Sequence, residues 1–352
     1  MKHLAALLFV PLLALVASDA AAGPPAKPPA QASYAKRPEV RAFIRDMVQR
    51  HGFVEGELTY LFSRVHRADQ VIEAIEQPAE KVRSWNYYRA TFLDERRVAA
   101  GAVFWRSHRA SLARAERAYG VPAEVIVAII GVETFYGRHT GNWRVVDALS
   151  TLAFDYRPRA GFFRNELESY LLFAREGNID VFATRGSYAG AMGLPQFMPS
   201  SARRYAVDFD RDGKVDLRRS PADAVGSVAN YLKQHGWRKD GPILLPARVN
   251  GDAWRALGGG FEPKLPLAKW REAGVELVRP APELGSQPAV LVELGGGDVP
   301  SDFRLGFRNF YVITRYNRSA MYAASVNDLA QALRARVPKA PKPAAKTQGE
   351  GK

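Results

Sequence analysis

Cysteine is absent from all 352 residues of the sequence. The chain therefore forms no disulfide bonds, binds no metal through thiolates and offers no cysteine for attachment of a lipid. The six histidines include no H-E-x-x-H pair, and no Gly-rich phosphate loop or aromatic RNA-binding motif occurs. With 47% hydrophobic residues, the chain is long and apolar enough to be stabilised by the packing of a large core.

After the first 22 residues, no apolar run is long enough to span a membrane. Leu4 to Val16 is apolar over 13 residues, follows the basic start Lys2-His3 and precedes three alanines at 20–22. This order is typical of a secretory leader, whereas a membrane-spanning anchor needs ~20 apolar residues. We therefore predict a cleavable signal peptide over residues 1–22 and an exported, periplasmic chain that has no transmembrane segment and no lipid anchor.

Acidic residues are outnumbered, with 36 Asp and Glu against 50 Lys and Arg, for a net charge of +14. An anionic polymer outside the cytoplasmic membrane, such as cell wall, fits both this charge and the predicted export, because unlike charges attract over long range. Nucleic acid is not expected as a partner of an exported chain. A basic surface that only confers solubility explains the charge equally well.

The spacing of apolar residues and the distribution of Gly and Pro divide the chain into segments. Residues 38–120 show helical periodicity, 121–240 carry further helices, and 241–318 contain short β-like runs. The predicted organisation is a signal peptide at 1–22, a Pro/Ala-rich linker at 23–37, a helical domain at 38–120 completed by a C-terminal helix at 319–337, a second, mainly helical core at 121–240, a small β-rich subdomain at 241–318 and a disordered basic tail at 338–352.

One acidic residue, Glu133, stands at the end of the apolar run Val125 to Val132. The run predicts a nearly fully buried helix over 123–135, begun after Pro122 and closed by Gly137. Burial raises the pKa of a carboxyl group, so that it can hold a proton near neutral pH and donate it. The alternative is a glutamate at a helix end whose carboxylate reaches solvent or an arginine.

A glycine-rich segment, GSYAGAMGLPQFMPSSARRY at 186–205, offers a second candidate. Glycines at 186, 190 and 193 let the backbone approach a neighbour closely, and Gln196 follows with an amide that donates and accepts hydrogen bonds. Such a loop suits the recognition of hydroxyl and acetamido groups on a sugar. A tight structural turn before a helix explains the same pattern.

Several segments taken together resemble the membrane-bound lytic murein transglycosylase B family. They are VIVAIIGVETFYGRHTG, DALSTLAFDY, GSYAGAMGLPQFMPSSARRYAVDFD, VGSVANYLKQHGW and NFYVITRYNRSAMYA, in this order. The resemblance implies an α+β fold that is predominantly α, in which a lysozyme-like catalytic core is joined by a helical domain and a small β-rich subdomain.

The same resemblance implies an enzyme that cleaves peptidoglycan glycan strands without water. The Glu of GVET, here Glu133, is the family's catalytic acid and base, and the substrate's acetamido group assists it. The bond cut is the β-1,4 bond between N-acetylmuramic acid and N-acetylglucosamine, which leaves 1,6-anhydromuramoyl ends. Family motifs place glycan contacts at Ser187, Gln196, Tyr231, Tyr316 and Asn317, with Tyr88 as a further candidate, whereas Tyr322 is expected in the core. Cell-wall synthesis proteins are possible additional partners.

Two other functions fit the same residues. A lysozyme-like hydrolase needs a second carboxylate at a suitable distance, and the sequence offers Asp147, Asp155, Glu166 and Glu168 without placing any of them. A protein that binds the cell wall without catalysis is the other alternative. An intact GVET motif and Gln196 argue against it, because a protein that had lost catalysis need not keep its acid.

The acidic segment at 208–223, DFDRDGKVDLRRSPAD, begins like an EF-hand loop. Asp208, Asp210 and Asp212 alternate before Gly213, and a backbone carbonyl follows at Lys214, as a Ca²⁺ loop requires. The twelfth position is an arginine, and the family resemblance implies a lengthened loop closed by Asp223. We predict a structural Ca²⁺ at these five residues and no cofactor for catalysis. An acidic turn neutralised by nearby arginines is the alternative.

Overall fold

The computed structural model describes residues 33–77, 84–296 and 299–337. The predicted signal peptide and basic tail lie outside these residues. Within the described part of the chain, no helix combines the length and the apolar character needed to cross a membrane. Helices dominate and strands are confined mainly to one region, which confirms the predominantly helical α+β fold expected from the sequence.

The α-helices occur along the whole described chain, and most begin or end at residues with the expected local chemistry. Ser84, Asp94, Ser220 and Ser319 each cap a helix through a side-chain oxygen. The helices are α1 (Pro38–His51), α2 (Glu55–Ser63), α3 (Asp69–Glu76), α4 (Trp85–Phe92), α5 (Glu95–Ser107), α6 (Arg109–Tyr119), α7 (Ala123–Thr134), α8 (Val145–Phe154), α9 (Ala160–Glu176), α10 (Pro199–Tyr205), α11 (Pro221–Gln234), α12 (Leu267–Glu272), α13 (Arg308–Tyr316) and α14 (Ala320–Arg336).

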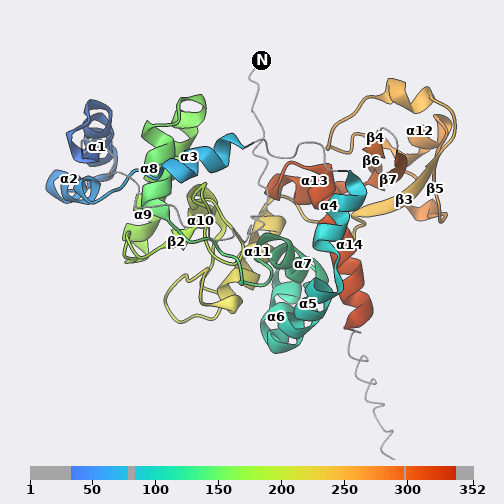
Figure 1. The fold of residues 1–352 in the computed structure, drawn as a ribbon. Helices are drawn as coiled ribbons and strands as arrows, with labels where there is room; N and C mark the ends of the chain where they lie inside the picture. The colour runs from blue at the N-terminus through green and yellow to red at the C-terminus, as the bar shows by residue number, and fades with distance from the viewer. Residues whose placement is uncertain (1–32, 78–83, 297–298, 338–352) are drawn as a thin grey trace, which may run out of the picture.

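The helices pack in two groups that lie side by side (Figure 1). In the first group, α8 packs against α9 and α3, and α9 packs against α10. In the second, α14 packs against α7, α5 and α4, and α11 packs against α6. The segment 38–120 divides its contacts between the groups, because α3 joins the first and α4 to α6 join the second. The C-terminal helix α14 thus packs back onto earlier helices.

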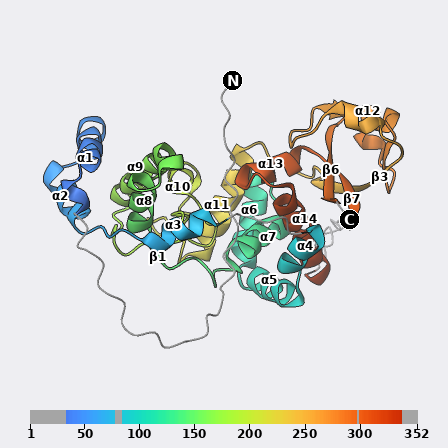
Figure 2. The ribbon, with the colours of Figure 1, turned by 45° about the horizontal axis from the view of Figure 1, so that its top comes forward.

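A five-stranded antiparallel sheet forms the end of the molecule opposite α1 and α2 (Figures 1 and 2). Its strand order is β4-β6-β7-β3-β5. The strands are β3 (Leu244–Val249), β4 (Leu265–Pro266), β5 (Val275–Leu277), β6 (Pro288–Gly296) and β7 (Val299–Gly306). A second, two-stranded sheet pairs β1 (Trp143–Arg144) with β2 (Arg185–Gly186).

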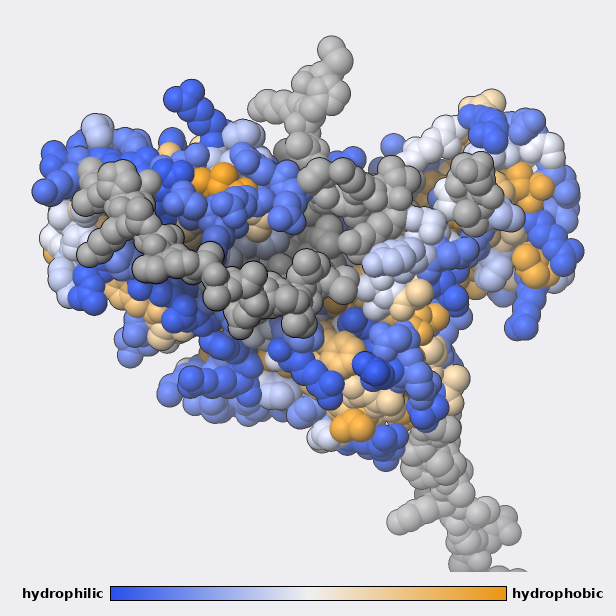
Figure 3. All heavy atoms as spheres, in the orientation of Figure 1, coloured by the Kyte–Doolittle hydropathy of each residue, from blue (hydrophilic) through white to orange (hydrophobic). Residues whose placement is uncertain are grey.

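Two hydrophobic cores stabilise these parts. The larger core runs from Tyr34 to Val337 in sequence and includes side chains of both helical groups. The smaller one lies in the sheet region around Trp270 and Phe307. On the face drawn in Figure 3 most of the surface is hydrophilic, and hydrophobic residues form only small patches.

The predicted linker at 23–37 is ordered at its C-terminal end. Residues Tyr34–Lys36 form a 3₁₀ helix, and the Tyr34 ring is buried. The Tyr34 hydroxyl donates a hydrogen bond to Asp155, and the Arg37 guanidinium pairs with the same carboxylate at 3.0 Å. Flexibility therefore does not extend to these residues, because an aromatic ring and an ion pair attach them to the end of α8. The rest of the predicted linker lies outside the described residues.

Candidate active site

Glu133 lies in the last turn of α7, a helix whose other side chains are almost all buried. The helix ends one residue later because Phe135 and Tyr136 adopt left-handed backbone conformations, with φ of 50° and 60°. Such values are unusual for residues other than glycine and are maintained only when surrounding contacts impose them. Arg97 supplies two of these contacts: its guanidinium lies 4.7 Å from the centre of the Phe135 ring, and its Nη1 donates to the Gly131 carbonyl at 2.5 Å.

The Glu133 carboxyl group is held in a mostly apolar setting. Burial raises its pKa from the ordinary value of 4.5 to about 7. The hydroxyl of Tyr322 on α14 donates a hydrogen bond to Oε1 of Glu133 at 2.6 Å, and this bond acts in the opposite direction, lowering the pKa. Glu133 is thus a carboxyl group that can carry a proton near neutral pH.

Three tyrosines and a phenylalanine line up beside this carboxyl group. The rings of Tyr322 and Tyr316 are nearly parallel with centres 6.5 Å apart, and Tyr316 meets Tyr231 edge on at 4.8 Å. Phe197 contacts both Tyr231 and Tyr316, at 5.5 and 5.8 Å. Burial raises the pKa of all three tyrosines, so that their hydroxyl groups stay protonated and can donate hydrogen bonds.

The loop that carries Gln196 is tied to both sides of this row. Thr134, the neighbour of Glu133, donates its hydroxyl proton to the Leu194 carbonyl at 3.0 Å, and Tyr316 donates to the Pro195 carbonyl at 2.5 Å. Gln196 itself has a φ of 48°, and its Nε2 donates to the carbonyls of Gly193 and Thr140. These contacts bring Glu133, Tyr316 and Gln196 into one region from three separate stretches of sequence.

The remaining predicted glycan contacts differ in their surroundings. Ser187 is partly exposed after β2, where its Oγ accepts the Ala191 N–H at 3.0 Å. Tyr231 donates its hydroxyl proton to the Arg315 carbonyl at 2.6 Å, and Asn317, two residues further along, is buried. Tyr88 on α4 is also buried, and it contributes to raising the pKa of Tyr322, after burial and Glu133.

Each carboxylate that the sequence offered as a second catalytic group is engaged elsewhere. Asp155 binds Tyr34 and Arg37, and Glu168 binds Arg50 and His51. Glu166 accepts both the N–H and the hydroxyl proton of Ser200, while Asp147 pairs with Arg144 at 3.1 Å and accepts the His66 N–H. All four lie on α8, at its end or on α9, in the helical group that does not contain α7.

The acidic loop brings three carboxylates together: Asp208, Asp210 and Asp212 each place an oxygen within 4.8 Å of the others. Asp208 also accepts backbone N–H groups of residues 211–213, which shapes the turn. Asp223, at the start of α11, is buried, and its two oxygens accept the N–H groups of Phe209, Asp210 and Asp216. In this geometry Asp223 closes the loop through the backbone.

Two residues near Glu133 were not among the predicted site residues. Tyr322 was expected in the core, and it is buried, but its hydroxyl is the hydrogen-bond donor to the carboxyl group. Arg97 is the second residue, and its guanidinium donates to the Gly131 carbonyl of α7. The amphipathic pattern of α5 does not indicate that Arg97 contacts α7. For Tyr322 the available sequence signal is the family segment NFYVITRYNRSAMYA, in which it lies.

Comparison with known proteins identifies one family of relatives. The transglycosylase SLT domain model matches residues 35–331. Membrane-bound lytic murein transglycosylase B of Escherichia coli strain K12 is 42% identical over 310 residues, which cover 85% of this chain and 84% of that protein. The crystal structure of the soluble lytic transglycosylase SltB1 from Pseudomonas aeruginosa matches with a TM-score of 0.80 at 48% identity, over 85% of this chain and 99% of that one.

Two further structures carry ligands. The Escherichia coli lytic transglycosylase Slt35 in complex with calcium matches with a TM-score of 0.77 at 41% identity, covering 86% of this chain and 95% of that chain. SltB3 of Pseudomonas aeruginosa in complex with NAG-anhNAM-pentapeptide matches with a TM-score of 0.76 at 34% identity, covering 84% and 79%.

These matches define the class, and the chain belongs to the transglycosylase SLT domain family. It is a peptidoglycan lytic transglycosylase with a lysozyme-like fold, which confirms the resemblance found in its motifs.

Proposed function

We propose that the chain cleaves the β-1,4 bond between N-acetylmuramic acid and N-acetylglucosamine without water and leaves 1,6-anhydromuramoyl ends. The observation that carries this proposal is the sheltered carboxyl group of Glu133, whose pKa burial raises to about 7. The predicted secretory leader would bring the chain to this polymer in the periplasm.

Glu133 acts first as an acid and then as a base in this scheme. Protonated Glu133 donates its proton to the glycosidic oxygen as the bond to the leaving sugar breaks. The acetamido carbonyl of the muramoyl residue stabilises the positive charge at the anomeric carbon. The ionised Glu133 then takes the proton of the muramoyl 6-hydroxyl as that oxygen bonds to the anomeric carbon, so that one carboxyl group serves both steps.

The surroundings of Glu133 favour this route over hydrolysis with a second carboxylate. The pKa of Glu133 depends on burial and on the Tyr322 hydroxyl, and no second carboxylate among the described residues contributes to it. A carboxylate close enough to assist would disfavour ionisation of Glu133 by like-charge repulsion. Asp147, Asp155, Glu166 and Glu168 each have other hydrogen-bond or ion-pair partners.

The tyrosine row and the Gln196 loop are suited to hold the sugar chain. We infer that Ser187, Gln196, Tyr231, Tyr316, Asn317 and Tyr88 form its binding groove. A tyrosine ring packs on the C–H face of a pyranose while its hydroxyl finds a polar partner. The hydrogen bonds of Tyr316 and Gln196 within the protein fix these groups in place before substrate binds, which reduces the entropy lost on binding.

Product analysis tests the proposed reaction. We expect digestion of purified peptidoglycan to release fragments with 1,6-anhydromuramoyl ends, which are lighter by one water molecule than fragments with reducing ends. Mass spectrometry of the fragments before chemical reduction makes this distinction. Reducing ends as the main product would replace the proposal by hydrolysis, and the absence of any released fragment would indicate a binding protein.

We further propose that the acidic loop binds Ca²⁺ through Asp208, Asp210, Asp212 and the Lys214 carbonyl, with Asp223 closing the site. The donor set fits, because hard oxygen ligands are those that Ca²⁺ prefers and three clustered carboxylates repel one another without a cation. The Slt35 relative was solved with calcium. Bound Ca²⁺ would neutralise this charge and stabilise the loop that leads into α11.

Calcium is therefore expected to raise the melting temperature of the protein. At a concentration of about 100 times its Kd a ligand stabilises the folded state by about 2.7 kcal/mol, which corresponds to an increase of about 4 °C for a chain of this size. Thermal melting with Ca²⁺ and with chelator measures the shift. Asp212→Asn should abolish it, whereas Asp252→Asn, at an exposed site outside the loop, should retain it. An unchanged melting temperature of the unmodified protein would contradict the proposal.

A further inference from the structure

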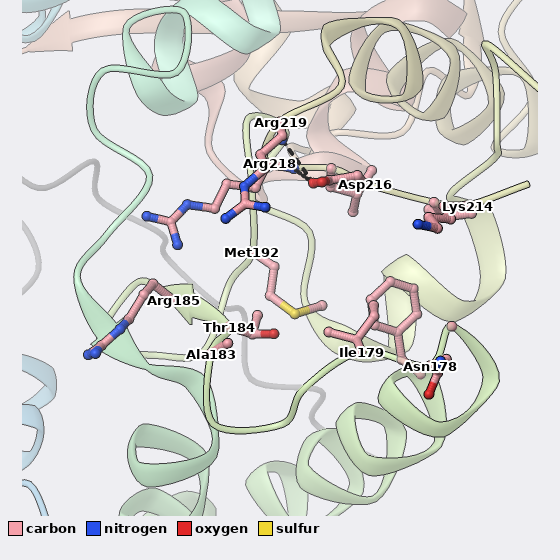
Figure 4. A pocket seen from close by; sticks show the side chains of 15 residues that line it. Asn178, Ile179, Ala183, Thr184, Arg185, Met192, Lys214, Asp216, Arg218 and Arg219 are labelled. Atoms are coloured by element: carbon pink, nitrogen blue, oxygen red, sulfur yellow. Dashed lines mark hydrogen bonds between the residues drawn. The ribbon is translucent and has the colours of Figure 1, made fainter. Parts of the chain in front are cut away.

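A cavity of about 330 Å³ lies between the end of α9, β2 and residues 214–219 of the acidic loop (Figure 4). Part of its lining is apolar, with Ile179, Met192 and Leu217 among the contributing residues. Figure 4 shows Met192 near the centre of this lining, with Arg185 to one side and Lys214 to the other. None of the residues proposed to act on the glycan lines the cavity.

Cationic side chains surround this apolar floor. The lining includes four cationic side chains, which we call the basic wall, and a single carboxylate, that of Asp216; the four are Arg185, Lys214, Arg218 and Arg219. Among the described residues, no ion pair or side-chain hydrogen bond engages Lys214, Arg218 or Arg219. A concave site with an excess of positive charge attracts anionic groups, and unpaired guanidinium groups bind carboxylates in two-pronged geometry.

Asp216 organises this basic wall. Its Oδ1 accepts the backbone N–H groups of Arg218 and Arg219, at 2.9 and 2.8 Å. The carboxylate therefore fixes the backbone of both arginines and leaves their side chains available. Figure 4 shows these two hydrogen bonds next to the guanidinium groups at the edge of the cavity.

The cavity is directly connected to the loop that carries Gln196. Gly193 lines the cavity, and its carbonyl accepts the Gln196 side-chain amide at 2.8 Å. On the other side, the Leu194 N–H donates to the Leu217 carbonyl at 2.8 Å. A Cβ atom on Gly193 would lie 2.4 Å from that carbonyl oxygen, so the two segments approach as closely as glycine allows. A substituent on a sugar bound near Gln196 is thus next to the basic wall.

We propose that this cavity binds the carboxylate groups of the peptide that substitutes the muramoyl residue. The inference rests on the proposed function, because it assumes that the glycan lies along Gln196. A pentapeptide spans up to ~17 Å when extended, which is ample for an adjacent cavity. It offers carboxylates for the arginines and small apolar side chains for the floor around Met192. The SltB3 relative was solved with a pentapeptide-bearing fragment.

Binding to the Glu133→Gln protein tests this proposal without depending on cleavage. Calorimetry would compare three ligands: NAG-NAM-pentapeptide, the NAG-NAM disaccharide without peptide, and the pentapeptide ligand with its carboxylates converted to amides. In this background, Arg218→Gln together with Arg219→Gln should weaken binding of the pentapeptide ligand about two- to thirty-fold, as expected for two solvent-exposed charge pairs. Binding of the other two ligands should change little.

A matched control replaces two exposed arginines that do not line the cavity, Arg106→Gln and Arg109→Gln. This pair has the same change in net charge and should bind the pentapeptide ligand as the parent does. If both double substitutions weakened binding of the pentapeptide ligand equally, net charge alone would explain the effect, and the proposal would be overturned. Equal loss for all three ligands, or tight binding of the amidated ligand by the parent, would also overturn it. Failure of the proposed reaction itself would appear separately, as reducing ends in the product analysis.

Discussion

The Glu133→Gln variant is expected to lose cleavage of peptidoglycan, with a decrease in kcat of at least about 1000-fold. Glutamine has nearly the same shape and can still accept the hydrogen bond of Tyr322 through its amide oxygen. It cannot donate a proton to the glycosidic oxygen or remove one from the 6-hydroxyl. Since both steps use the same carboxyl group, the substitution removes both, and release of soluble fragments from purified peptidoglycan measures the loss.

Binding separates this effect from damage to the fold. Sedimentation with insoluble peptidoglycan should show the Glu133→Gln protein bound nearly as well as the unmodified protein, since the tyrosine row and Gln196 are unchanged. Glu57→Gln provides the control, because Glu57 is exposed on α2 in the other part of the molecule and should have no effect on cleavage. Full activity of the Glu133 variant would remove that residue from the mechanism.

Helix α7 was predictable in its extent but not in its ending. An apolar run between Pro122 and Gly137 indicates a buried helix, and the observed helix covers most of that range. The prediction placed the ending at Gly137, yet the left-handed conformations begin at Phe135. Local sequence favours glycine for such a conformation. At Phe135 it is imposed by tertiary contacts, among them the Arg97 guanidinium over the ring, which no local pattern contains.

The hydrogen-bond partner of Glu133 could not be derived from the sequence at all. Tyr322 lies 189 residues from Glu133 and belongs to a helix whose apolar pattern indicates only burial. Its burial was predicted and is confirmed. The hydrogen bond depends on how α14 packs against α7, which is a property of the folded chain. In the acidic loop, by contrast, alternating Asp residues before a glycine fix a local turn, and the cluster of three carboxylates follows from this spacing.

Titration of Glu133 should be visible in the stability of the protein. Its pKa is about 7 in the folded state and 4.5 ordinarily, so the folded protein binds the proton more tightly than the unfolded chain does. The folded state is therefore favoured below pH 4.5, and this contribution is lost as the pH rises through 7. Integrated over that range the loss is roughly 3 kcal/mol.

Comparison with the Glu133→Gln variant isolates this contribution from other titrating groups. The variant should gain stability relative to the unmodified protein by up to roughly 3 kcal/mol between pH 4 and pH 8, as measured by urea unfolding. Tyr322→Phe removes the hydrogen bond that lowers the pKa of Glu133, so the pKa of Glu133 should be higher in this variant. The pH-dependent decrease in stability of the Tyr322→Phe protein should therefore continue to a higher pH than in the unmodified protein. Parallel stability profiles of Glu133→Gln and the unmodified protein would mean that the carboxyl group titrates normally. Because a proton donor must keep its proton near neutral pH, the same result would also deprive the proposed mechanism of its acid.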